Sequence, residues 1–220
     1  MNSWRALVRR FGKEDRGATF LEFTIVFVPF LLILMGIIEF SLVFWQWNTA
    51  TKAAYRGARL AAVSTPVDST LKSFTGLASG IAPGTPIAIG GANAYAERSC
   101  TGTNNTSGTC ANGTYSAAAM ARLVYGNETL TSCPATPASP REIGMCHFFP
   151  GLTPANVRVV YTHTGLGFAG RPGGPVPTVT VELRNLTFGY FFLSGLSRLT
   201  TITMPPLTAT VTGEDLATSS

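Results

Sequence analysis

The chain has 220 residues, of which only 12% are charged, and carries a formal net charge of +5 with a pI near 9.3. This length fits a membrane anchor plus one domain of ordinary size. Five basic side chains lie within the first 17 residues, and the remainder has 11 basic and 9 acidic side chains. The excess charge therefore belongs to a leader, and nucleic-acid binding, which needs a basic surface on the domain, is not expected.

One apolar run, Phe20–Phe44, dominates the N-terminal part of the chain. Within it, Phe23–Ile38 contains no charged residue, and Glu22 and Glu39 stand near its two ends. A bilayer core requires about 20 residues of helix, so we predict a transmembrane helix. Pro29 is tolerated in such a helix. The alternative is a cleaved secretory signal peptide, but its apolar region would be shorter and would end at a small-residue site that this run lacks.

The charges on either side of this run indicate its orientation. The basic leader, residues 1–17, holds five Lys and Arg side chains, whereas Lys52, Arg56 and Arg59 follow the run. The positive-inside rule therefore predicts a cytoplasmic N-terminus and export of the remainder. All four cysteines lie in the exported part, where an oxidising compartment permits disulfides.

The helix is predicted to continue beyond the membrane. Trp45 and Trp47 are aromatic residues of the kind that gather at membrane–water interfaces. Small side chains then recur at the spacing of one helix face, namely Ala50, Ala53, Ala54, Gly57, Ala58 and Ala61. We interpret this small-residue stripe as a surface that a second backbone approaches closely, since Gly57 otherwise only lowers helix propensity. The alternative is that alanine is simply a good helix former. Pro66 ends the helix, so residues 18–63 form one segment.

Residues 64–96 are rich in glycine and proline and are interpreted as a linker region with one short helix near residues 69–77. Residues 97–212 are predicted to form the exported domain, and residues 213–220 a disordered tail. Only polar residues and glycine separate Cys100 from Cys110, so a disulfide closing that loop is the simplest pairing and leaves Cys133 to bond Cys146. Four cysteines allow three pairings, and the sequence does not choose among them.

The hydrophobic period changes from helical to strand-like within the exported domain. A short helix is predicted at residues 115–125. After it, apolar or β-branched residues alternate with polar ones in four runs, at residues 157–162, 178–184, 200–204 and 207–212. Such runs indicate a small antiparallel sheet with one solvated face. The predicted class is α+β, with a long N-terminal transmembrane helix, a small exported domain and disulfide-linked loops.

No motif in the exported domain indicates catalysis. Gly165, Gly167 and Gly170 have the spacing of a dinucleotide fingerprint, but the prolines that follow exclude the helix that such a site needs. His147 and His163 are the only histidines, and cysteines held in disulfides cannot bind a metal. We therefore predict no enzymatic activity, no cofactor and no metal.

Glu22 differs from the other acidic residues because an ionisable group inside a membrane usually marks function or a partner. The alternative is a carboxylate that reaches the headgroups beside Arg16. If the chain were cut between Gly17 and Ala18, Glu22 would be the fifth residue of the mature chain. Its carboxylate could then neutralise the new α-amine. Glu39, at the far end of the run, is interpreted as an interfacial acid.

The stretch Gly17-Ala-Thr-Phe-Leu-Glu22-Phe23 resembles the class III signal of type IV prepilins. The longer segment from Arg16 to Arg59 resembles the TadE-like family of the Flp (Tad, tight-adherence) pilus system. The features that carry this resemblance are an Arg-Gly entrance, Glu22-Phe23, Pro29 in mid-helix, Gly36 with Glu39, and an alanine-rich exit. Phe23 stands where the major Flp pilins usually carry tyrosine.

This resemblance implies a minor pilin or pseudopilin of a bacterial inner membrane. A prepilin peptidase would trim it after Gly17, and Glu22 and Phe23 would dock it against pilin-like subunits and the Tad assembly machinery. Two alternatives stay open. One is an unprocessed membrane-anchored scaffold of the pilus machinery, and the other is a membrane-anchored periplasmic enzyme or binding domain.

Overall fold

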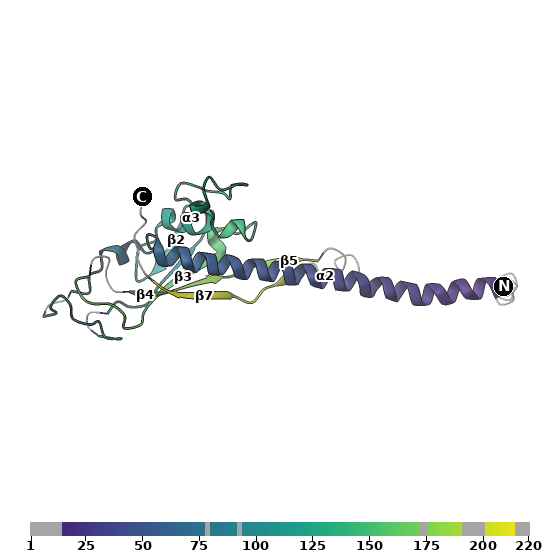
Figure 1. Cartoon of the computed structure of the whole chain (residues 1–220), viewed down its shortest axis with the longest axis horizontal. Helices are drawn as coiled ribbons and strands as arrows, with labels where there is room; N and C mark the ends of the chain where they lie inside the picture. Colours follow the sequence, from purple (N-terminus) through teal and green to yellow (C-terminus); the bar gives the residue numbers. More distant parts are fainter. Residues whose placement is uncertain (1–14, 78–79, 92–93, 172–175, 191–200, 214–220) are drawn as a thin grey trace, which may run out of the picture. The chain divides into compact units, whose positions relative to one another are not determined.

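The computed structural model describes residues 15–77, 80–91, 94–171, 176–190 and 201–213, with side chains from Thr19 onward (Figure 1). The chain divides into two compact units. The first consists of residues 1–44 with 189–202, and the second of residues 45–188 with 203–220. Most of the predicted leader and tail lie outside the described residues.

The dominant helix is α2, Asp15–Val63, which belongs to both units (Figure 1). Pro29 lies inside this helix, as is tolerated in apolar helices. The helix ends just before the Ser64-Thr-Pro66 sequence because the residue before a proline disfavours helical backbone angles. The Ser64 hydroxyl donates a hydrogen bond to the carbonyl of Leu60. This bond supplies a partner to one of the last carbonyls of the helix, which lack backbone donors. The predicted long N-terminal helix is thus confirmed.

The second unit contains one more α-helix, α3, Ala117–Tyr125. The Ser116 side chain caps its first turn by accepting a hydrogen bond from the Ala119 N–H, and Gly126 ends it in a left-handed conformation. Four short 3₁₀ helices complete the helical elements that the structure describes: η1, Ser69–Ser73; η2, Pro140–Glu142; η3, Met145–His147; and η4, Pro154–Asn156.

The main sheet of the second unit has five strands in the order β2-β1-β3-β4-β7, and each neighbouring pair is antiparallel. Their bounds are β1, Arg98–Gly102; β2, Gly108–Ala111; β3, Val157–His163; β4, Pro177–Leu183; and β7, Leu207–Thr212. Two further strands, β5 (Thr187–Gly189) and β6 (Thr201–Thr203), form a separate two-stranded sheet. The predicted α+β class with an antiparallel sheet is confirmed.

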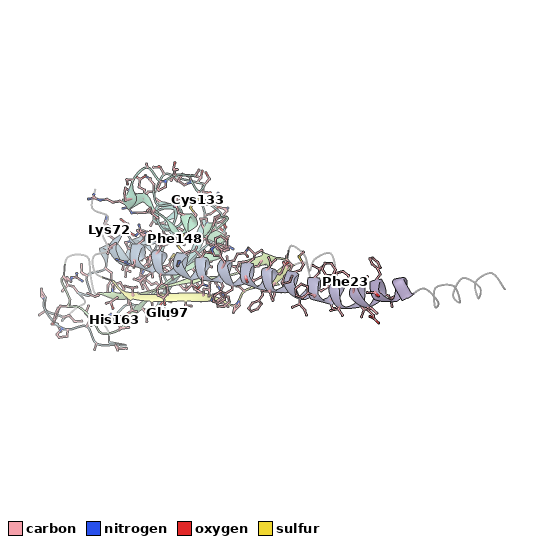
Figure 2. All side chains as sticks on the ribbon, turned by 45° about the vertical axis from the view of Figure 1, so that its right-hand side comes forward. Phe23, Lys72, Glu97, Cys133, Phe148 and His163 are labelled. Atoms are coloured by element: carbon pink, nitrogen blue, oxygen red, sulfur yellow. A yellow bond between two sulfur atoms is a disulfide. The ribbon has the colours of Figure 1, made fainter. Side chains whose placement is uncertain are left out.

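Alternation along the two central strands builds the core of the second unit. Every second residue of β3 and β4 is buried and the others are half-buried, as one covered sheet face requires. In both Figure 1 and Figure 2 the part of α2 that follows Trp45 lies alongside this sheet. The small-residue stripe faces inward there, with Ala50, Ala53 and Ala58 each 0% exposed.

The segment between Cys100 and Cys110 differs from the predicted polar loop, because β1 and β2 form a hairpin. Cys100 lies opposite Cys110 on one side and opposite Val159 of β3 on the other. Only the turn itself is irregular, and the Asn104 side chain holds it by accepting hydrogen bonds from the backbone of two following residues. Pairing with β3 and the disulfide outweigh the low strand propensity of this sequence.

The predicted linker, residues 64–96, also differs from expectation, because it contributes buried side chains to the core. Val67, Leu71 and Ile87 are at most 1% exposed, and Tyr95 is 6% exposed. The short helix expected near residues 69–77 is only the 3₁₀ helix η1. Within the predicted run at residues 200–204, Thr201–Thr203 form the exposed strand β6, outside the main sheet.

Gly126 provides a test of how closely α3 packs on the segment before η3. A Cβ built at Gly126 would lie only 1.8 Å from the carbonyl oxygen of Glu142. The φ angle of Gly126 is 94°, which is in the left-handed region. Gly126→Ala should lower the free energy of unfolding by about 3 kcal/mol, as strained backbone and overpacking typically do. Gly151→Ala is the matched control, since Gly151 has a φ of 86° with nothing within 4 Å. The control should cost only about 1 kcal/mol in urea denaturation, and equal losses would contradict the close approach.

Candidate functional site

The predicted cleavage and docking residues lie in the first turns of α2. Gly17 and Ala18 are helical, and the Glu22 side chain is exposed. Residues four apart in a helix lie on one face, so the carboxylate of Glu22 and the backbone nitrogen of Ala18 are on the same side, one turn apart. Phe23 is 60% exposed and stacks on Phe27, with ring centroids 5.0 Å apart (Figure 2).

The apolar segment Phe20–Phe44 leaves its hydrophobic side chains uncovered within the chain. An 18-residue window of this helix has a mean hydropathy of 2.5, and none of it is buried. Its few hydroxyl groups bond within the helix, since Thr24 donates to the Phe20 carbonyl and Ser41 to the Ile37 carbonyl, each at 2.8 Å. In lipid, polar groups must find their hydrogen-bond partners within the protein, and apolar side chains can face the acyl chains. The segment Phe20–Phe44 meets both conditions.

Glu39 is the exception on this segment, being 2% exposed and the one buried residue among residues 19–44. The sequence predicts an interfacial acid at this position, and the structure adds that the chain itself buries the residue. Ionised carboxylates are almost never buried without compensating contacts, so the position is structurally constrained.

The small-residue stripe is covered by the chain's own second unit. A Cβ at Gly57 would lie 2.5 Å from the sulfur of Met145, so glycine makes room for that buried side chain. Beside it, the Arg56 Nε donates to the carbonyl of Ile143 at 2.8 Å. At Gly57 the stripe is thus approached by a side chain of the same chain, that of Met145.

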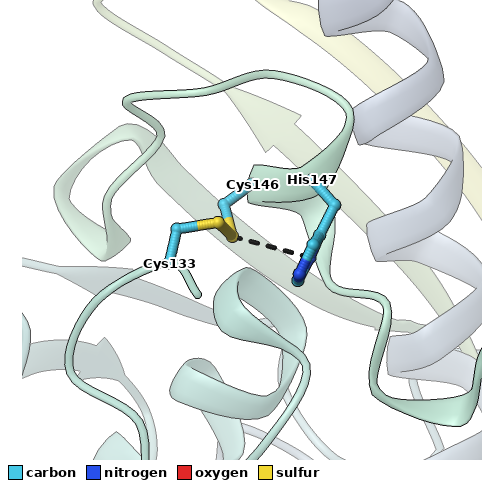
Figure 3. A group of neighbouring side chains, drawn as sticks. All are labelled: Cys133, Cys146 and His147. Atoms are coloured by element: carbon cyan, nitrogen blue, oxygen red, sulfur yellow. Dashed lines mark hydrogen bonds between the residues drawn. A yellow bond between two sulfur atoms is a disulfide. The ribbon is translucent and has the colours of Figure 1, made fainter. Parts of the chain in front are cut away.

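The structure pairs the cysteines as Cys100–Cys110 and Cys133–Cys146. The second disulfide lies beside His147, whose Nδ1 is 3.7 Å from the Cys146 sulfur (Figure 3). The three potential ligand atoms lie within 4.8 Å of one another. Both sulfurs are bonded in the disulfide and neither is a thiolate, so this group does not offer a metal site.

A buried ion pair, Asp68–Arg98, joins the predicted linker to β1 and was not predicted from the sequence. The Arg98 guanidinium lies 2.7 Å from the Asp68 carboxylate, which is 0% exposed. The carboxylate also accepts hydrogen bonds from the N–H groups of Thr70 and Thr114. Burial alone would raise the pKa of Asp68, but these donors and Arg98 together hold it below its ordinary value. Asp68 caps η1 through Thr70, which is a local contact, but Arg98 and Thr114 are 30 and 46 residues away, so no local pattern indicates the ion pair.

The glycines at positions 165, 167 and 170 form a loop, as predicted. All three have positive φ values, and Phe168 between them forms an isolated bridge with Pro86. Gly170 and Arg171 are not helical, and residues 172–175, which follow them, lie outside the described residues.

A comparison with protein families identifies the helical region. Residues 17–59 match the family described as TadE-like protein. The resemblance expected from the sequence is thus confirmed over this range. No curated protein and no solved structure gives a significant match to the chain.

The TadE-like match begins at the predicted cleavage glycine and extends through most of the small-residue stripe. TadE-like proteins are components of the Tad pilus system, so the match suggests involvement in that system. The single apolar N-terminal helix and this family together fit a membrane-anchored protein. The sheet domain lies outside the matched residues.

Proposed function

We propose that the protein is a membrane-inserted minor pilin or pseudopilin that takes part in assembly of a Flp/Tad-type pilus. The observation that carries this proposal is the uncovered apolar helix of the TadE-like segment, with one exposed acid, Glu22, in its second turn. In this function the N-terminus lies in the cytoplasm of a bacterial inner-membrane protein and the sheet domain is exported, in accord with the charge distribution. A catalytic role is not part of the proposal.

We further propose that a prepilin peptidase cuts the chain between Gly17 and Ala18. The new amine of Ala18 would then lie one helical turn from the Glu22 carboxylate, in surroundings with little water. Charge neutralisation between this amine and Glu22, within a subunit or between neighbours, would allow the apolar helices to associate side by side, because it removes the cost of an unpaired charge in lipid.

Processing predicts a defined change of mass. Protein purified from membranes of a strain with an active prepilin peptidase should begin at Ala18, as measured by intact-protein mass spectrometry. Gly17→Val, which places a branched side chain at the scissile bond, should leave the full-length chain. Gly36→Ala is the control, because a Cβ at Gly36 has nothing within 4 Å, and it should be processed normally. A terminus at Met1 or Asn2 in the wild-type protein would reject processing.

A gene deletion tests the broader function. Cells lacking this protein should lose surface pili of the Flp type, and expression of the wild-type chain should restore them, as counted by electron microscopy. Normal pilus number in the deletion strain would contradict a role in assembly.

A further inference from the structure

The two cysteines of the Cys133–Cys146 disulfide have very different surroundings. Cys133 is exposed and lies in a segment, residues 130–138, that forms neither helix nor strand. Cys146 is 1% exposed and lies in η3, next to the buried Met145. The residue at one end of this bond (Figure 3) is therefore exposed, and the residue at the other end is buried.

In the other disulfide, Cys100–Cys110, both cysteines lie in strands. Cys100 is 0% exposed in β1, and Cys110 lies directly opposite it in β2. Four residue pairs of the hairpin hold the two cysteines together, and β3 covers the other edge of β1. If a thiol attacked this bond, the freed cysteine would stay adjacent to the mixed disulfide on the other cysteine and would close the bond again by displacing the attacking group.

His147 adds a polar group at the enclosed end of the Cys133–Cys146 bond. Its Nδ1 lies 3.7 Å from the Cys146 sulfur and accepts a hydrogen bond from the Gly144 N–H at 3.1 Å. Because Nδ1 is an acceptor in this contact, the ring hydrogen is on Nε2. That nitrogen is buried without a hydrogen-bond partner among the described residues. This imidazole is thus a polar side chain beside the Cys146 sulfur, the atom that becomes negatively charged when the bond opens.

We propose that the Cys133–Cys146 disulfide is a thiol-exchange site of the folded protein, which a dithiol enters at Cys133. The attacking thiolate forms a new bond to the Cys133 sulfur, the bond between Cys133 and Cys146 breaks, and its electron pair remains on Cys146 as a thiolate beside His147. The second thiol of the dithiol then attacks the mixed disulfide and releases Cys133. The protein disulfide is reduced by two electrons, the dithiol is oxidised to its own disulfide, and the two thiol protons end on Cys133 and Cys146.

The fold permits this exchange because the contacts that seat η3 do not depend on the disulfide. The Met145 side chain fills the space above Gly57, and the Ile143 carbonyl accepts a hydrogen bond from Arg56. Gly126 and Gly144 also bring the end of α3 into backbone contact with this segment. Opening the bond thus frees the loop around Cys133 and leaves η3 in place on α2.

Differential alkylation of the full-length protein in detergent micelles tests the proposal. The protein is incubated with dithiothreitol, quenched with an alkylating reagent at successive times, and each cysteine is quantified by peptide mass spectrometry. Cys133 and Cys146 should become alkylated at least about ten times faster than Cys100 and Cys110, as differences in sulfur access imply. With glutathione, a monothiol, the mixed disulfide should form on Cys133. Equal rates for the two pairs, a requirement for denaturant, or a glutathione adduct on Cys146 would each overturn the proposal.

Two substitutions separate the chemical role of His147 from a structural one. In His147→Asn the side-chain oxygen can still accept the Gly144 N–H, whereas His147→Ala removes both the acceptor and the imidazole. Exchange at Cys133 should slow by about ten-fold in both variants, with circular dichroism unchanged in His147→Asn. His163→Asn, at the other histidine, should leave the rate unchanged. Wild-type exchange in His147→Asn would contradict the role given to the imidazole.

Discussion

Asp68→Asn is expected to lower the free energy of unfolding by about 3–5 kcal/mol, the usual cost of leaving one member of a buried ion pair unpaired. The Asp68 carboxylate is fully buried, and the Arg98 side chain is only 12% exposed. The substitution also places an amide nitrogen among groups that donate hydrogen bonds, namely the Thr70 and Thr114 N–H groups. Urea denaturation of the full-length protein in detergent, followed by circular dichroism, measures the loss.

A second acid–arginine pair of the same sheet provides the control. Glu182 and Arg158 are 3.3 Å apart, but their side chains are 16% and 31% exposed. Glu182→Gln should therefore cost less than about 1 kcal/mol. If the two variants lost similar free energies of unfolding, burial would not be the reason for the contribution of the Asp68–Arg98 pair to stability.

The same carboxylate predicts a dependence of stability on pH. Because its pKa in the folded protein lies below the ordinary value, its contribution is complete above the pKa of the unfolded chain. The contribution is lost as the pH falls through the lower pKa of the folded state. The wild-type protein should consequently lose stability on acidification below about pH 4, and Asp68→Asn should lose less over the same range.

Glu22→Gln is expected to abolish incorporation of the protein into pili with little effect on its insertion in the membrane. The substitution keeps the size of the side chain and removes the charge that would neutralise the new amine of Ala18. An unpaired amine in lipid costs several kcal/mol, which corresponds to a loss of association by two orders of magnitude or more. The measurement is the fraction of this protein that co-purifies with sheared pili, relative to the fraction in the membrane.

Two further substitutions make this result specific. Glu22→Asp retains the charge and should restore part of the incorporation. Thr24→Ala removes a hydroxyl that bonds only to the Phe20 carbonyl of its own helix, and it should be neutral. Unchanged incorporation of Glu22→Gln would instead favour an unprocessed scaffold that acts through its sheet domain, because such a protein has no new amine to neutralise.

The apolar helix was predictable because its signal is local. A membrane helix satisfies its backbone groups within one segment, so composition over about 20 residues suffices to locate it. Strands β3 and β4 were also predictable, since one buried face imposes a strict alternation on each of them. The helix α3 followed from its own sequence, with a serine cap at its start and a glycine at its end.

The sequence by itself determined where the membrane-compatible helix lies, which residues alternate in the central strands, and that Glu22 is an acid in an apolar surrounding. Only the tertiary structure decided that the polar segment around Cys100 is a hairpin, that Asp68 meets Arg98, and that Met145 packs against Gly57. The physical reason is the range of the interactions. Helical hydrogen bonds and periodic burial act between near neighbours, whereas strand pairing, ion pairs and core contacts join residues that are far apart in the chain.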